Sequence, residues 1–310
     1  MTTATGTTTA TSQTRSRSRR PAPTASPSPP DDTTLVRRFT VWQRLTHAVL
    51  ALSVFGLVFT GMPLKFSSTF WAEPLIDVWG GPWLAGRFHR VFALGFFLSA
   101  VMHVGEIALA VARRRVHSPF HPDSIVPRPE DARHLVQYLR FMTDRGPRPE
   151  FGKFTYWEKF DYLAPTWGLV IIGLSGLIMW FPEQSLGALP GWAVNAALIF
   201  HSDEAFLAAG FLFGIHFFNT HLRPEAFPVD MVMVTGTVTL DELRHERPGW
   251  YERLTTTGEL DRLIVRTPRR ASRALVLGGM VLLALGILMM LLVVTTAVLE
   301  AWHYLSSALG

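Results

Sequence analysis

Long apolar segments recur five times along the chain, and each is long enough to cross a lipid bilayer. They cover roughly residues 41–62, 88–112, 163–181, 193–218 and 274–304. The last has no charged residue between Ala274 and Leu299, and about 20 apolar residues suffice for a transmembrane helix. Within lipid, a helix satisfies its own backbone hydrogen bonds. The pattern therefore predicts an all-α integral membrane protein built as a transmembrane helix bundle.

Basic residues divide the connecting segments into two classes. Of the 29 lysines and arginines, seven lie before or early in the first span, ten in residues 113–159 and nine in residues 223–273. The three others are Lys65, Arg87 and Arg90. Because basic residues concentrate in cytoplasmic loops, we expect a bacterial inner-membrane protein with its N-terminus in the cytoplasm and its C-terminus outside. This distribution accounts for the net charge of +5 without a nucleic-acid partner.

The same patterns divide the chain into four parts. Residues 1–36 are rich in Thr, Ser, Pro and Arg and cannot bury enough apolar surface to fold, so we expect a disordered cytoplasmic tail. A four-helix core should follow over residues 37–224 and a cytoplasmic loop over residues 225–273. Residues 274–310 should form a fifth transmembrane helix and a short outer tail.

The composition limits the chemistry that such a bundle can carry. Only 17% of the residues are charged, compared with about 25% in a typical soluble domain. The chain has no cysteine, which excludes thiolate metal sites and iron–sulfur clusters held by this chain and covalent haem attachment through a C-x-x-C-H motif. A redox centre would therefore need histidine, methionine or oxygen ligands.

Five histidines lie inside the first four predicted spans, where ionisable residues are costly and mark function. They are His47 in the first span, His89 and His103 in the second, and His201 and His216 in the fourth. The two histidines of the second span are 14 residues apart and those of the fourth are 15 apart, which corresponds to a rise of about 21–22 Å. We therefore expect an outer layer with His89 and His201, and an inner layer with the other three.

Two imidazoles in one layer suit the axial positions of a haem iron, and two haems stacked across the bilayer would carry electrons from one face to the other. The outer layer offers two candidates but the inner layer offers three, so one inner histidine must do something else, such as contact a quinone or a haem edge. Arg44 and Arg90 lie at membrane edges, where guanidinium groups would pair with haem propionates. His221 lies at the cytoplasmic rim on another side of its helix and is left out of the ligand set.

Several short motifs follow one another in a fixed order through the first four spans. They are RLTH at 44–47, TG at 60–61, GRFH at 86–89, KFTY at 153–156 and GLIMW at 176–180, followed by His201 and His216. No single motif is specific, but the ordered set resembles the di-haem cytochrome b subunits (gamma subunits) of formate dehydrogenases. It is also similar to the cytochrome b subunits of nickel–iron hydrogenases and thiosulfate reductases.

The resemblance implies a four-helix di-haem core with an added fifth helix. It implies two haem b groups that pass electrons between the iron–sulfur and catalytic subunits of a membrane-bound oxidoreductase and the quinone pool. It assigns one haem to His47 and His216 and the other to His89 and His201, which leaves His103 as a quinone contact or an alternative haem ligand. Such a chain is an electron-transfer subunit rather than a stand-alone enzyme, and no residue receives a catalytic role. The histidines of the fourth span are one residue closer together in the family, so a local wide turn is expected here.

Two other functions remain open from the residues alone. His117 with His121, and His216 with His221, look like the histidine boxes of membrane di-iron enzymes such as desaturases, although such a site would leave the outer pair unused. A non-redox transporter would need polar residues near the bilayer midplane, and the acidic candidates, Asp203 and Glu204, lie near an outer span end. A b-type absorption spectrum separates bound haem from both alternatives.

Overall fold

A computed structural model of the chain describes residues 1–6, 33–113, 121–223, 227, 229–265 and 272–309. All the helices and strands that it describes belong to one compact unit formed by residues 32–310. The expected disordered tail falls largely on residues 7–32, which lie outside the described residues.

Among the described residues, five helices are long and apolar enough to cross a membrane. They are α1 (Val41–Lys65), α3 (Pro82–Ala112), α5 (Tyr156–Trp180), a helix that continues from α7 (Gly191–Gly210) through the π-helical segments η1 (Phe211–His216) and η2 (Phe218–Leu222), and α12 (Arg273–Leu309). The prediction of an all-α transmembrane bundle with five spans is confirmed.

Two spans begin earlier than their apolar residues indicated: a polar cap starts α5, and a proline starts α3. The Thr155 side chain accepts a hydrogen bond from the Glu158 N–H at 3.2 Å, and the Glu158 carboxylate accepts one from the Thr155 N–H at 2.8 Å. This capping box starts α5 at Tyr156 and satisfies amide groups that have no partner within the helix. In α3 the first turn begins with Pro82, which has no N–H to satisfy there.

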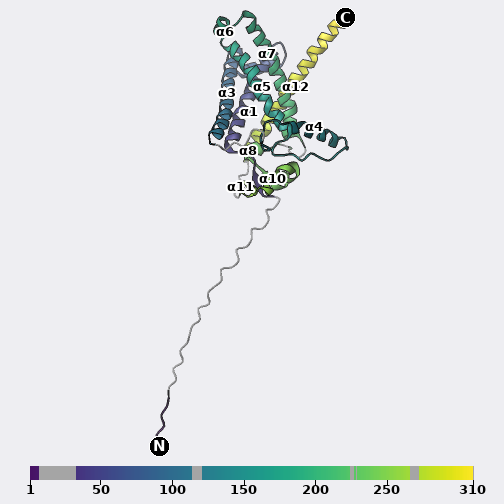
Figure 1. Cartoon of the computed structure of the whole chain (residues 1–310). Helices are drawn as coiled ribbons and strands as arrows, with labels where there is room; N and C mark the ends of the chain where they lie inside the picture. Colours follow the sequence, from purple (N-terminus) through teal and green to yellow (C-terminus); the bar gives the residue numbers. More distant parts are fainter. Residues whose placement is uncertain (7–32, 114–120, 224–226, 228, 266–271, 310) are drawn as a thin grey trace. The chain divides into compact units, whose positions relative to one another are not determined.

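The first four spans form two helical hairpins. Helix α1 packs along α3 and α5 packs along α7, whereas the two hairpins touch each other much less extensively. The loop of each hairpin contains a helix of seven residues, α2 (Ala72–Val78) in the first and α6 (Pro182–Ala188) in the second. The fifth span, α12, packs on α1 and α7 and leans away from them towards its C-terminal end (Figure 1). Its contact with the first and fourth spans is an apolar cluster that includes Val58, Phe213, Phe217, Met289 and Val293.

A small folded layer, here called the cap, joins the chain before α1 to the segment between η2 and α12. Strand β1 (Leu35–Arg37) pairs antiparallel with β2 (Thr237–Thr239). The remaining elements of the cap are α8 (Val232–Thr235), α9 (Leu240–Glu246), α10 (Pro248–Thr256) and α11 (Leu260–Leu263). Its buried core consists of Val36, Val238, Leu240, Leu243, Trp250, Leu254 and Leu260. Strand β1 overlaps the end of the expected tail, and the expected loop contains secondary structure with an apolar core of its own.

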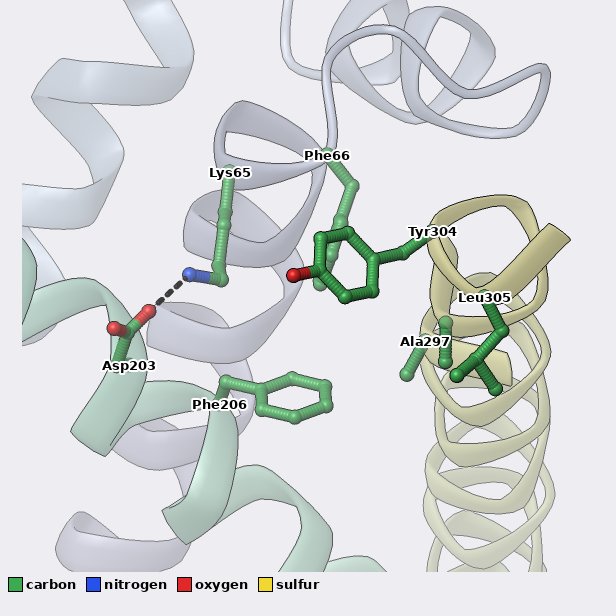
Figure 2. Close-up of a pocket in the computed structure, with 8 residues that line it drawn as sticks. Lys65, Phe66, Asp203, Phe206, Ala297, Tyr304 and Leu305 are labelled. Carbon is green, nitrogen blue, oxygen red and sulfur yellow. Dashed lines mark hydrogen bonds and ion pairs between the residues drawn. The ribbon is translucent and has the colours of Figure 1, made fainter. Parts of the chain in front are cut away.

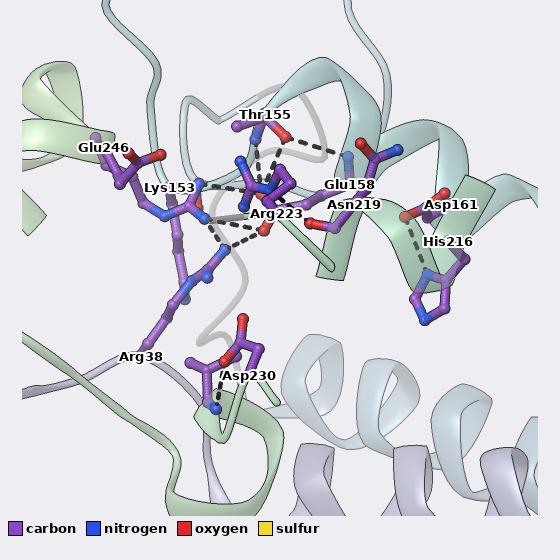
Figure 3. A network of polar contacts seen from close by, with 12 residues as sticks. Arg38, Lys153, Thr155, Glu158, Asp161, His216, Asn219, Arg223, Asp230 and Glu246 are labelled. Carbon is purple, nitrogen blue, oxygen red and sulfur yellow. Dashed lines mark hydrogen bonds and ion pairs between the residues drawn. The ribbon is translucent and has the colours of Figure 1, made fainter. Parts of the chain in front are cut away.

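Ion pairs connect the cap to the start of α5. The Glu158 carboxylate accepts hydrogen bonds from Arg38 at 2.6 Å and from Arg247 at 3.0 and 3.1 Å, at the centre of the network in Figure 3. Burial lowers the pKa of the Arg247 guanidinium, as does the charge of Arg38, while Glu158 opposes both effects. Helix α4 (Pro129–Met142) is tied to α5 by a 2.8 Å ion pair between Asp131 and Lys159.

Candidate functional site

His89 of α3 and His201 of α7 come from different hairpins and lie against each other. Their ring centroids are 6.2 Å apart, and the ring planes are inclined by 69°. Two imidazoles on opposite sides of one metal ion form metal–nitrogen bonds of about 2 Å, which with a ring radius of about 1 Å puts their centroids about 6 Å apart. The pair is therefore spaced for one metal ion between its two rings.

Hydrogen bonds fix the tautomers of both outer histidines. His201 Nδ1 lies 2.9 Å from the carbonyl oxygen of Ile172, which can only accept, so this nitrogen carries the proton. His89 Nδ1 lies 2.8 Å from Thr60 Oγ1, and that hydroxyl lies 2.7 Å from the Gly56 carbonyl, to which it donates. Nδ1 of His89 is therefore also the donor, and both rings keep Nε2 free. A hydrogen bond on one ring nitrogen and a free lone pair on the other is the usual state of a metal-binding histidine.

Two glycines allow the outer rings to pack closely on the neighbouring helices. A Cβ atom at Gly61 of α1 would lie 3.0 Å from Cε1 of His89, and one at Gly176 of α5 would lie 3.0 Å from Cε1 of His201. Carbon atoms in favourable contact are about 3.5–4.0 Å apart, so a larger residue at either position would push the ring away. The neighbouring helices thus fix the orientation of each ring as well as its tautomer.

The inner layer is organised around His216. Its Nδ1 lies 3.1 Å from Oδ2 of Asp161 (Figure 3), and a carboxylate that accepts this proton leaves Nε2 free. His47 of α1 lies within electrostatic range of both His216 and His221. The π-helical segment η1 ends at His216, and a π turn accommodates one extra residue. The wide turn expected in the fourth span is thus confirmed.

The two other histidines of this region differ from the candidate ligands in their hydrogen bonds. His103 Nε2 lies 2.7 Å from the hydroxyl of Tyr162, so this nitrogen is already hydrogen-bonded. His221 Nδ1 accepts a hydrogen bond from the Asp230 N–H at 3.2 Å, which puts the proton of a neutral ring on Nε2. Neither ring presents a free Nε2 in this arrangement.

The histidine geometry and the ordered motifs agree with one protein family. The family model of prokaryotic cytochrome b561 matches residues 38–222, more than half of the chain. The chain belongs to this family. The cytochrome is therefore a multi-pass protein of a prokaryotic inner membrane that binds haem b and transfers electrons. The resemblance inferred from the sequence is confirmed at the level of the family; none of the curated proteins compared matches the chain.

Of three unpaired polar atoms around the inner pair, the two that can donate fit a haem group with carboxylate side chains. Among the residues that the structure describes, Arg44 Nε, Thr46 Oγ1 and Asp161 Oδ1 are buried without a hydrogen-bond partner. Two of these residues belong to the first turns of α1 beside His47, and the third holds His216. Buried polar groups normally have partners, and a propionate would supply an acceptor for the arginine and for the threonine hydroxyl.

Both arginines expected near propionates contact neighbouring groups in the structure. Arg44 Nη2 donates to the carbonyl of Val234 in the cap, and the Arg90 guanidinium lies 5.6 Å from the centre of the Trp180 ring. A guanidinium has five N–H donors, so both side chains retain donors for a carboxylate. Their role at the propionates stays a prediction.

Sequence reasoning missed the residues that orient the histidines. Asp161, Tyr162, Ile172 and Ser175 all belong to α5, the span without a histidine, and their importance lies in what they touch in other helices. One signal was present: Ser175 precedes Gly176 as Thr60 precedes Gly61 in the TG motif.

Other candidate sites in the cytochrome are a metal cluster and a surface pocket. No group of three or more His, Asp or Glu residues that could hold a metal ion occurs in the described part of the chain; His117 of the first histidine box lies outside it. An open pocket of about 590 Å³ lies between the C-terminal ends of α1 and α12 and the middle of α7. On its wall, Lys65 and Asp203 form a 2.7 Å ion pair (Figure 2). The pocket has no histidine in its lining.

Proposed function

We propose that this cytochrome is a membrane-anchoring di-haem subunit that carries electrons across the bilayer between a partner oxidoreductase and the quinone pool. His89 and His201 would hold the iron of the outer haem, and His47 and His216 that of the inner haem. The observation that carries the proposal is the outer pair, whose rings are spaced for one metal ion and whose Nδ1 atoms are both hydrogen-bonded.

A haem iron with two axial imidazoles has no open position for substrate and supplies one-electron transfer. The role of the protein is to keep both imidazoles in the ligating tautomer and to fix their orientation. Thr60 and the Ile172 carbonyl do this for the outer rings, and Asp161 does it for His216. Along a helix, 14 residues correspond to about 21 Å, so the two layers together would carry electrons across most of the hydrocarbon core.

The partners that we propose are the iron–sulfur and catalytic subunits of a membrane-bound oxidoreductase, as in the complexes whose cytochrome subunits the sequence resembles. The family match and the ordered motifs support this assignment. Quinone exchange is assigned to the inner layer, beside His103. Its ring and the Tyr162 side chain are only half-buried, and their mutual hydrogen bond leaves one polar hydrogen that can be donated to a quinone carbonyl.

Haem stoichiometry and the optical spectrum of the purified cytochrome test the proposal. Two non-covalent haems per chain are expected. His89→Ala and His201→Ala should each remove the outer haem, and His47→Ala and His216→Ala should each remove the inner one. His103→Ala and His221→Ala are matched controls from the same helices and should keep both haems low-spin. A chain with one haem would contradict the transmembrane path. Loss of a haem in His103→Ala but not in His47→Ala would make His103 the inner ligand.

A further inference from the structure

The two hairpins repeat the same sequence pattern at a constant offset. Residues 39–44 read FTVWQR and residues 154–159 read FTYWEK. Adding 115 to a residue number of α1 gives the matching position of α5. In each copy a threonine forms a capping box with the residue three positions later, and each copy starts a helix of 25 residues.

The hydrogen bonds around the outer histidines repeat at the same offset. The Thr60 hydroxyl contacts the carbonyls of the residues four and three positions earlier, at 2.7 and 3.2 Å. The Ser175 hydroxyl does the same at 2.6 and 3.2 Å. The next residue in each helix is the glycine that packs on His89 or on His201. The first hairpin (α1 with α3) and the second (α5 with α7) are therefore two copies of one unit, each with a seven-residue helix in its loop.

This correspondence relates the inner residues in pairs. His103 follows His89 by 14 residues, and His216 follows His201 by 15, of which the π turn of η1 absorbs one. His216 is thus the counterpart of His103. On the first helix of each hairpin, the counterpart of His47 is Tyr162, because their numbers differ by 115. The inner layer therefore holds two equivalent pairs, His47 with His216 and Tyr162 with His103.

We propose that Tyr162 determines the haem stoichiometry of the inner layer by turning the second copy of the ligand pair into a hydrogen-bonded pair. The inference rests on the proposed function, in which His47 and His216 bind the inner haem. The Tyr162 hydroxyl lies 2.7 Å from His103 Nε2, and the two ring centroids are 5.5 Å apart. The phenol thus occupies the nitrogen and the space that an iron would take.

A histidine at position 162 would restore the lost ligand. Its side chain is shorter than that of tyrosine, so the ring nitrogens of His103 and of the introduced residue would be separated by a gap. Two metal–nitrogen bonds of about 2 Å each span a gap of about 4 Å. Tyr162→His should therefore convert the hydrogen-bonded pair into a bis-imidazole site between α3 and α5.

The test moves the inner haem from one copy of the site to the other. His47→Ala should reduce the purified cytochrome from two haems to one. The double variant His47→Ala/Tyr162→His should bind two again, with a second low-spin haem in the optical and electron paramagnetic resonance spectra. Two controls should remain at one haem: His47→Ala/Tyr162→Phe, which removes the hydroxyl without adding an imidazole, and the triple variant that adds His103→Ala to the double variant.

The proposed ligand pair and the role of Tyr162 can be contradicted separately. If His47→Ala keeps both haems, the proposed ligand pair is wrong. If His47→Ala holds one haem and the double variant also holds one, the role of Tyr162 is overturned. The outer haem reports whether the double variant is folded. If the signal of the outer haem is lost, the comparison is repeated with His216→Ala in place of His47→Ala, which removes the inner ligand from the other helix. Failure of Tyr162→His to restore a second haem in that background also overturns the inference.

Discussion

At the scale of single residues, the close contact between two glycines and two imidazoles decides whether the outer pair can bind metal. A methyl group at Gly61 or Gly176 would lie 3.0 Å from its histidine ring, and relieving such overpacking costs about 1–3 kcal/mol. We expect Gly61→Ala and Gly176→Ala each to lose the outer haem in a haem-to-protein assay. Gly105→Ala in α3 has nothing within 4 Å of the added atom and should keep both haems. Equal haem loss in all three variants would point to a general effect on the helices.

The hydroxyl groups next to these glycines should differ in importance. Thr60 Oγ1 is 2.8 Å from His89 Nδ1, whereas Ser175 Oγ is 3.4 Å from His201 Nδ1, and there the Ile172 carbonyl is closer at 2.9 Å. Loss of an outer-shell partner typically lowers metal affinity by about 10–100-fold. Thr60→Val should therefore weaken haem binding by about tenfold in a titration of the haem-depleted protein, while Ser175→Ala should change it little. The opposite order would contradict the assignment of the stronger orienting contact to Thr60.

At the scale of the elements, the π turn before His216 sets the phase of the inner ligand. Deleting the half-exposed Ile215 from η1 should let the segment close into regular α-helix. His216 would then follow His201 by 14 residues, as His103 follows His89, and would keep its present direction. We expect this variant to keep two low-spin haems. Deleting Leu50 from α1, where no π turn can absorb the change, should rotate His47 by about 100° relative to Thr60 and remove the inner haem. Haem loss in the Ile215 deletion and not in the Leu50 deletion would contradict this account.

The spans and the layering of the histidines could be predicted from the sequence because both depend on local properties. A run of apolar residues and a count of residues along a helix need no knowledge of neighbouring helices. The cap could not be predicted in this way. Its core residues occur singly or in short runs, and Val36 meets Val238 only because β1 pairs with a strand about 200 residues later. The partners of the ligands were missed for the same reason, since Asp161 and Tyr162 act on histidines of other helices.

At the scale of the whole molecule, the cap is held on the bundle by the cluster of Arg38, Glu158 and Arg247. The two arginine side chains are 3% and 10% exposed, and Glu158 is 30% exposed. Glu158→Gln would leave two buried positive charges facing each other, and breaking such a pair costs about 3 kcal/mol or more. We expect a clear loss of stability in denaturant unfolding of the detergent-solubilised protein. Glu246→Gln breaks the more exposed pair with Arg148 and should cost less than about 1 kcal/mol.

The contacts of the cap agree with the sidedness that we propose from the charges. Strand β1 precedes the first span and β2 follows the fourth, so their pairing requires both segments to lie on one face of the membrane. The basic segments 113–159 and 223–273 meet on that face through Arg148 and Glu246, and basic loops stay in the cytoplasm.

The absence of natural cysteine allows a direct measurement of this sidedness. Gly187→Cys in α6 has open space around the new side chain and should react with a membrane-impermeant maleimide in intact cells. Thr256→Cys in α10 is also at an exposed position but should react only after the membrane is opened. Reaction of the second position in intact cells, with protection of the first, would invert the assignment of both histidine layers and place His47 and His216 at the outer face.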